Sequence, residues 1–232
     1  MLLATSWREA VYVSKDNGQN WKLLSEGLEK SKQADEFNQP HFTKIVAAGD
    51  GAFLLAGFAA LYRSEDGGES WHRIEISLGN AVSLDISSVS GSSFTLALST
   101  YGSGVLLSDD QGQSWSFANK RLWNPRRNAI AFSPGDIDDR RLFSGTYGGI
   151  ATAEGAAEVW RGVDLGRLED LQGAYLAPTP QSIAISPNFQ RDQTLFVGMY
   201  PHGMLRSVDG GRTYSLIWQG SSPTRSLAIS PG

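Results

Sequence analysis

The chain has 232 residues, of which 41% are hydrophobic and 19% charged, so it is long enough to bury a core and too apolar for a disordered chain. Its formal charge of −4 has the wrong sign for general binding to a phosphate backbone, which argues against nucleic acid as a partner. Cysteine is absent, which excludes disulfides, thiolate catalysis and cysteine-ligated zinc or iron–sulfur clusters.

The first residues do not show a basic segment followed by an apolar run, and no run approaches the ~18 apolar residues of a membrane span. We therefore expect no signal peptide and no transmembrane segment in this chain. These features leave its cellular compartment open. The 26 glycines exceed the usual share and indicate frequent tight turns, which favours an all-β fold.

A short motif, S-x-D-x-G-x-x-W/Y, occurs four times along the chain, at residues 14–21, 64–71, 108–115 and 207–214. A fifth, decayed copy aligns residues 149–160 with 203–214 and keeps only the aromatic, Trp160. The aspartates and aromatics of the intact copies are Asp16, Trp21, Asp66, Trp71, Asp110, Trp115, Asp209 and Tyr214.

Short apolar runs of strand length, bounded by Gly, Asp, Asn and Pro, surround each motif. In the last unit they predict four antiparallel strands at residues 182–186, 194–200, 203–207 and 213–218. Residues 2–6 should be the second strand of the first unit. Four short strands in a repeat of roughly 45 residues make one blade of a β-propeller.

The four motifs resemble the Asp-box, or BNR, repeat of sialidases, sortilin-type receptors, xyloglucan-active glycosidases and photosystem II assembly factors of the Ycf48 type. The resemblance implies that each box forms the hairpin between the third and outermost strands of a blade, away from the ligand face. The residue types agree, because Asp accepts hydrogen bonds from turn amides, Gly supplies a positive φ and the aromatic covers the edge of the blade. A structural role is therefore expected for the four aspartates.

The final phrase, residues 225–231, repeats the first-strand phrase at residues 181–187. We therefore predict one domain over residues 1–232, a five-bladed propeller of four-stranded antiparallel blades. The C-terminal strand would pair with the three N-terminal strands and close the ring, which removes sheet edges. The alternative is that the chain is part of a larger propeller cut in the same phase.

Every blade offers one aromatic residue after its second strand, at a corner that should surround one mouth of the central channel. These candidates are Trp7, Phe58, Tyr101, Tyr147 and Tyr200, with Arg8, Glu9 and His202 beside them as candidate polar contacts. Five rings around an axis would suit stacking on a sugar, an apolar side chain or a cation. Alternatively, the rings cap strand ends and fill the channel.

A second candidate is the loop that contains Trp123, Arg126 and Arg127, which joins several basic residues to one aromatic. Such a loop could receive an oxyanion or an acidic partner surface. It could equally be a solvated loop that balances nearby acids.

Catalytic signatures are weak. A glycosidase needs two facing carboxylates, and Glu9 is nearly the only channel-side candidate. No histidine spacing, nucleophile elbow or phosphate loop is present. We therefore expect a monomeric, non-catalytic recognition propeller without cofactor or metal, which binds a small ligand, a glycan or a protein segment. A sialidase-like glycoside hydrolase and an assembly scaffold of the Ycf48 type are the alternatives.

Overall fold

The computed structural model describes residues 1–5, 11–24, 26–28, 42–49, 51–57, 60–74, 80–88, 94–122, 127–135, 139–147, 149–155, 159–165, 179–200, 203–220 and 222–230. In these residues the chain is all-β apart from one short helix, α1 (Phe189–Asp192). None of the described helical segments is long and apolar enough to cross a membrane.

The strands form five antiparallel sheets in chain order. Sheet one holds β1 (Leu2–Thr5), β2 (Val11–Ser14) and β3 (Lys22–Leu24). Sheet two holds β4 (Phe42–Ala47), β5 (Phe53–Gly57), β6 (Ala60–Ser64) and β7 (His72–Ile74). Sheet three holds β8 (Asn80–Ser88), β9 (Phe94–Tyr101), β10 (Gly104–Ser108) and β11 (Ser116–Phe117). Sheet four holds β12 (Arg127–Phe132), β13 (Arg141–Thr146), β14 (Gly149–Glu154) and β15 (Trp160–Asp164). Sheet five holds β16 (Thr179–Ile185), β17 (Leu195–Tyr200), β18 (Met204–Ser207) and β19 (Ser215–Trp218).

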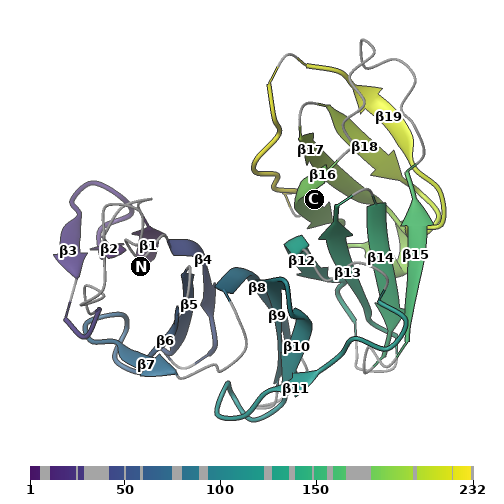
Figure 1. Ribbon diagram of the computed structural model, residues 1–232. Helices are drawn as coiled ribbons and strands as arrows, with labels where there is room; N and C mark the ends of the chain where they lie inside the picture. Colours follow the sequence, from purple (N-terminus) through teal and green to yellow (C-terminus); the bar gives the residue numbers. More distant parts are fainter. Residues whose placement is uncertain are drawn as a thin grey trace.

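The sheets are arranged as the blades of a propeller. Each is a meander in which every strand pairs with the next in sequence. The first strands β4, β8, β12 and β16 lie on the inside of a curved arrangement, and the last strands β7, β11, β15 and β19 lie on its outside (Figure 1). Neighbouring inner strands contact each other from β4 through β8 and β12 to β16. The prediction of an all-β, propeller-like fold is confirmed.

The predicted strands of the last unit agree with the structure to within a few residues, from β16 to β19. Residues 2–6 were predicted to be a second strand. The structure agrees, because β1 pairs with β2, the strand that leads into the first box.

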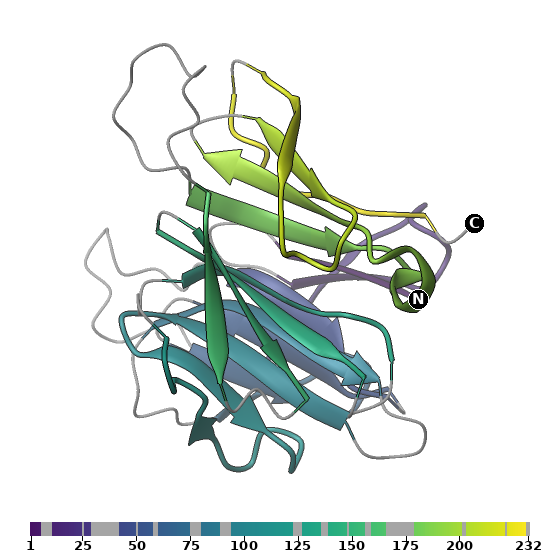
Figure 2. The ribbon, with the colours of Figure 1, turned by 90° about the vertical axis from the view of Figure 1, so that its right-hand side faces the viewer.

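The hydrophobic core is divided into layers between adjacent sheets. Leu54, Leu84 and Leu98 belong to the layer between sheets two and three, and Phe143 and Leu195 to the layer between sheets four and five. A view from the side shows the fifth sheet, in light green to yellow, stacked over the fourth (Figure 2). Because each sheet buries both faces against its neighbours, the sheets at the two ends each need something to cover one face.

The predicted closure of the ring is not confirmed. Sheet one has three strands and lacks the innermost one, and the described residues 222–230 contain no strand. Thr224 instead bonds to sheet five: its N–H donates to the Met199 carbonyl at 3.1 Å and its hydroxyl to the Gly203 carbonyl at 3.0 Å. These bonds hold the start of the segment beside its own preceding sheet, on the far side of the gap from β1.

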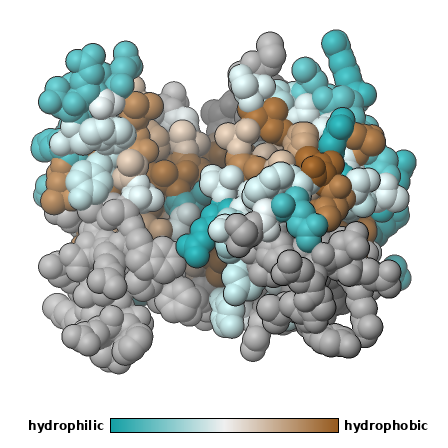
Figure 3. Space-filling view, turned by 90° about the horizontal axis from the view of Figure 1, so that it is seen from above, coloured by the Kyte–Doolittle hydropathy of each residue, from teal (hydrophilic) through white to brown (hydrophobic). Residues whose placement is uncertain are grey.

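A gap separates sheet one from sheet five, with the two chain ends on opposite sides of it (Figure 1). Seen from above, hydrophobic residues gather on both sides of this gap (Figure 3). Most exposed large hydrophobic residues of the described chain belong to these two end sheets and the turns beside them, namely Met1, Leu2, Trp21, Leu23, Tyr200, Val208, Ile217 and Trp218. The two end sheets therefore carry most of the exposed large apolar side chains of the described residues.

Candidate functional site

Each of the four intact boxes forms the same hydrogen-bonded turn between the last two strands of its sheet. In the second box, the buried Ser64 hydroxyl donates to Asp66 Oδ1 at 2.8 Å and accepts from the Gly68 N–H at 2.8 Å. The Ser70 N–H donates to the same carboxylate at 2.9 Å. The same pattern recurs around Ser14, Ser108 and Ser207. The aspartates therefore hold the turn, as their residue type predicted.

These bonds lower the pKa of all four box carboxyls, because each bond is made to the ionised form. The backbone and side chain of Asn20 lower the pKa of Asp16 from 3.8 to about 2. The side chain and backbone of Ser114 do the same for Asp110. Burial raises the pKa of Asp209, but bonds from Thr213 and Ser207 outweigh it and leave a value of about 2. The Ser70 hydroxyl and amide hold the pKa of Asp66 well below its usual range.

The glycine of the S-x-D-x-G motif packs against the preceding sheet in three of the four boxes. A Cβ on Gly112 would lie 3.6 Å from Leu54, and one on Gly211 would lie 2.7 Å from Phe143, so the turn and the neighbouring sheet fit closely. Gly68 is similarly close to Leu3, at 3.3 Å. The nearest side chains to Gly18, in contrast, are from its own sheet. The first box thus faces the gap.

The decayed box of sheet four uses longer-range contacts. Its aromatic, Trp160, is only 2% exposed, and its indole Nε1–H donates to the Ala118 carbonyl in the connection before the sheet. The Trp160 amide also donates to the Lys120 carbonyl, at 3.1 Å. The alignment of the repeats predicted that Trp160 takes the place of the box aromatic, and the structure shows that the carbonyls of Ala118 and Lys120 are its partners.

The predicted aromatic corner is described in three of the five sheets. Tyr101 ends β9, Tyr147 follows β13 and Tyr200 ends β17, and these side chains are 51%, 50% and 47% exposed. Since the second strand runs in the same direction through each successive sheet, the three tyrosines lie on the same face of the arc. The other members of this candidate site, Trp7, Arg8, Glu9, Phe58 and His202, lie outside the described residues.

The predicted basic loop is described only at its end. Arg127 is the first residue of β12, where it pairs with Thr146, and Trp123 and Arg126 lie outside the described residues. No group of three or more His, Asp or Glu side chains in the described part of the chain is placed to hold a metal ion.

Sequence reasoning missed the polar contacts that join sheets three and four. Arg140 is 2% exposed and donates to the Ser87 hydroxyl at 2.6 Å and to the Thr95 hydroxyl at 2.9 Å. Its guanidinium also lies over the Phe132 ring, 5.0 Å from the centroid. Burial lowers the pKa of Arg140, and the nearby Asp109 opposes this effect. Nothing in the sequence distinguished this arginine from its exposed neighbours.

Asp85 on β8 makes a second contact between these sheets by accepting a 2.7 Å hydrogen bond from the Phe132 N–H. Desolvation raises the pKa of the Asp85 carboxyl, while this bond and the charge of Lys44 act in the opposite direction. Asp85 is the one acidic residue on the strands β4, β8, β12 and β16. Its bond to Phe132 indicates a structural role.

Residues 12–23 match the BNR/Asp-box repeat family. No curated protein matches the chain. The fold resembles YCF48 bound to D1 peptide, with a TM-score of 0.59 and 20% identity over 89% of this chain and 60% of that one. It also resembles the GH74 xyloglucanase from Xanthomonas campestris, with a TM-score of 0.60 and 18% identity over 93% of this chain and 36% of that one.

A further similar structure is PorZ of the type-IX secretion system of Porphyromonas gingivalis, with a TM-score of 0.63 and 14% identity over 98% of this chain and 34% of that one. The chain spans about 60% of the length of the YCF48 structure and smaller shares of the other two. At these identities the likeness establishes a BNR-type, propeller-like fold.

Proposed function

We propose that this protein is a non-catalytic binding propeller that recognises a glycan, a small ligand or a peptide at its aromatic corner. The observation that carries the proposal is the half exposure of Tyr101, Tyr147 and Tyr200 at equivalent positions of three successive sheets. Most large apolar side chains of these sheets are buried between blades, so three half-exposed tyrosines on one face form a repeated surface feature. Tyrosine suits such a surface because it combines a stacking face with a hydroxyl group.

A recognition role is favoured over hydrolysis by the carboxylates on the inner strands. Glycoside hydrolysis needs two acidic side chains facing the bond that is cleaved. Asp85 is the one such residue on the described inner strands, and its carboxylate already accepts a bond from the Phe132 amide. The structural neighbours include a peptide-bound YCF48 and a xyloglucanase, so both peptide and glycan ligands are compatible with this fold.

The test is to probe a glycan array and a peptide array with the wild-type protein and with the triple variant Tyr101→Ala, Tyr147→Ala, Tyr200→Ala. We expect the variant to bind the selected ligand at least ten-fold more weakly. Phe117→Ala is the matched control, because Phe117 is equally exposed but lies on the outermost strand β11. The proposal is wrong if the wild type binds nothing on either array, or if the triple variant and the control behave alike.

We further propose that residues 225–230 close the ring by pairing with β1. This segment repeats the sequence of β16, and the register of β16 on β17 can be transferred directly. β1 has the same register on β2 as β17 has on β18, which places Leu227 opposite Ala4 and Ile229 opposite Leu2. Closure would also cover the apolar sides of the gap and give the first box a preceding sheet.

Cysteine pairs test this closure cleanly, because the chain contains no cysteine of its own. The variant Ala4→Cys, Leu227→Cys should form an intramolecular disulfide under mild oxidation. The control Ala4→Cys, Ala228→Cys should not, since adjacent strand residues point to opposite faces. Mass spectrometry with and without reductant distinguishes these results. Disulfide-linked dimers, or no disulfide in either variant, would instead favour an arc that belongs to a larger ring.

A further inference from the structure

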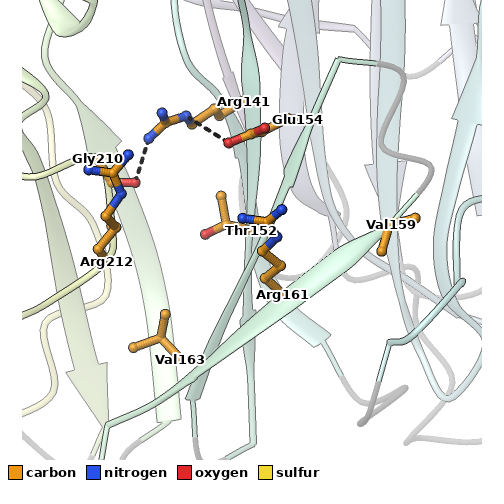
Figure 4. A pocket seen from close by; sticks show the side chains of 9 residues that line it. Arg141, Thr152, Glu154, Val159, Arg161, Val163, Gly210 and Arg212 are labelled. Atoms are coloured by element: carbon orange, nitrogen blue, oxygen red, sulfur yellow. Dashed lines mark hydrogen bonds and ion pairs between the residues drawn. The ribbon is translucent and has the colours of Figure 1, made fainter.

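A groove of about 590 Å³ lies between the outer strands of sheet four and the box turn of sheet five. It is lined by Arg141, Thr152, Glu154, Val159, Arg161, Val163, Gly210, Gly211 and Arg212. Figure 4 shows the side chains of Arg141, Arg161 and Arg212 around one space, with Thr152 between them and Val163 below. The groove is on the outer part of the arc, away from the inner strands.

The equivalent place between sheets two and three is filled. There Arg63 occupies the strand position that Thr152 occupies in sheet four, because Arg63 directly precedes the box serine and Thr152 directly precedes Ala153, which aligns with that serine. Arg63 donates to the Gln111 carbonyl at 2.6 Å and to the Gln111 side chain at 2.9 Å, and it pairs with Glu65 at 3.0 Å. A long side chain with its charge neutralised thus fills that interface. The shorter Thr152 leaves the corresponding space open in sheet four.

Arg141 binds the neighbouring box turn between sheets four and five, as Arg63 does between sheets two and three. Its Nη1 donates to the Gly210 carbonyl at 3.0 Å, the box position that corresponds to Gln111, and its Nε lies 3.8 Å from Glu154 Oε1. The charge of Arg141 is therefore paired with Glu154, and its remaining hydrogen bond holds the box turn of sheet five.

The other two guanidinium groups of the groove do not take part in contacts that hold the described sheets together. Arg161 on β15 and Arg212 in the box turn are exposed, and neither guanidinium has a hydrogen bond or ion pair to the described part of the chain. The corresponding box positions in the other sheets hold Gln19, Glu69 and Gln113, so Arg212 is the one cation at this position. With three arginines and one glutamate, the groove carries an excess of two positive charges.

We propose that this groove is a binding site for a small organic anion with carboxylate or phosphate groups. Guanidinium groups bind both kinds of oxyanion through paired, charge-assisted hydrogen bonds. Arg161 and Arg212 bind the oxyanion from two different sheets, and Val159 and Val163 form an apolar wall for its carbon skeleton. This site is separate from the tyrosine corner and does not depend on the proposed function.

Isothermal titration with citrate and, separately, with inorganic phosphate tests the proposal and distinguishes the two oxyanions. We expect saturable binding of at least one of them. The double variant Arg161→Gln, Arg212→Gln should weaken it at least ten-fold, because it removes both unpaired charges. Arg191→Gln is the control for a charge change elsewhere, since Arg191 is exposed on α1, and it should leave binding unchanged.

A second variant fills the groove without removing a charge. Thr152→Leu introduces the residue type found at the equivalent position in sheet three, Leu107, and should weaken binding by a similar factor. The proposal is overturned if neither citrate nor phosphate binds, if Arg191→Gln weakens binding as much as the double variant, or if the double variant binds like the wild type.

Discussion

The intact box turns and the outer turn of sheet four occupy the same place in their blades but are held by different contacts. In an intact box the side-chain bonds are local, from Ser64 to Asp66 and from Gly68 to Ser64, although the Trp71 amide also donates to the distant Glu26 carbonyl at 3.0 Å. In sheet four, Trp160 is bound by carbonyls of Ala118 and Lys120, about forty residues earlier in the chain. The comparison shows that sheet four keeps the buried aromatic and its distant amide partner without the serine–aspartate bonds, and adds the indole bond to Ala118.

Backbone geometry separates the same two kinds of turn. The intact boxes place two successive residues at positive φ, such as Asn17 and Gly18 or Gly67 and Gly68. In sheet four, positive φ occurs at Gly155, the position that aligns with the aspartate. The backbone of sheet four therefore differs from that of the boxes at the aspartate position, and the residues aligned with the two positive-φ positions lie outside the described residues.

The largest expected effect is at the aromatic anchor. Trp160→Ala should lower the free energy of unfolding by about 3–5 kcal/mol, because it removes a buried ring and leaves the Ala118 carbonyl without its donor. Trp21→Ala is the matched control: Trp21 holds the same box position in sheet one but is 44% exposed, so the loss should be about 1 kcal/mol or less. Urea unfolding followed by circular dichroism measures both. Equal losses would contradict the difference in burial between the two rings.

A smaller loss is expected at the box serine. Ser64→Ala should cost about 1–3 kcal/mol, because it leaves the buried Gly68 amide without an acceptor and removes a donor to Asp66. Ser70→Ala is a milder change, since the Ser70 amide still donates to Asp66 and the hydroxyl is exposed. If the two variants unfold at the same urea concentration, the buried serine is not what holds the turn.

The box carboxylates should also make the protein acid-sensitive. The folded pKa of Asp16 and Asp110 is about 2, below the ordinary 3.8, so their contribution to stability is present above about pH 4 and is lost as the pH falls toward 2. Urea midpoints measured between pH 2 and 6 should therefore fall at the acid end. The double variant Asp16→Asn, Asp110→Asn should be less stable at pH 6 and should lose less on acidification. A pH dependence identical to that of the wild type would contradict the assignment.

The smallest expected effect is a gain. Asn17 has a φ of +59°, a conformation that costs less for glycine than for other residues, so Asn17→Gly should stabilise the protein by less than about 1 kcal/mol. Gln111 has a φ of +63°, but its side chain accepts a bond from Arg63, so Gln111→Gly should give no such gain. Thermal unfolding compares the two variants, and a loss of stability in Asn17→Gly would contradict the role of positive φ in the turn.

Much of the architecture followed from repeats in the sequence. The boxes predicted the hairpins, and the short apolar runs predicted β16 to β19 within a few residues. Closure by the C-terminal strand was also predicted, but the described residues 222–230 contain no strand, so this prediction is not confirmed. A repeat of the strand sequence identifies a segment that can form a strand but not the edge to which it pairs, because that choice depends on the curvature of all the blades.

The candidate sites were less accessible to sequence reasoning. The tyrosine corner follows from strand spacing, and the exposure of its three described members agrees with a position at strand ends. Arg140 and Arg141 are neighbours in sequence, yet Arg140 bonds to sheet three and Arg141 to sheet five. Alternation along a strand separates their directions, but only the packed neighbours decide which arginine is buried and which borders a groove.

The sequence by itself determined the repeating unit: the local bonds of the Ser–Asp–Gly turn and the period of two along each strand are encoded within a few residues. The tertiary structure decided what lies between the units, because burial and charge pairing there depend on side chains that different sheets bring together. Trp71 and Trp21 hold the same box position, and one is 1% exposed while the other is 44% exposed, since sheet one covers the first and the gap leaves the second uncovered.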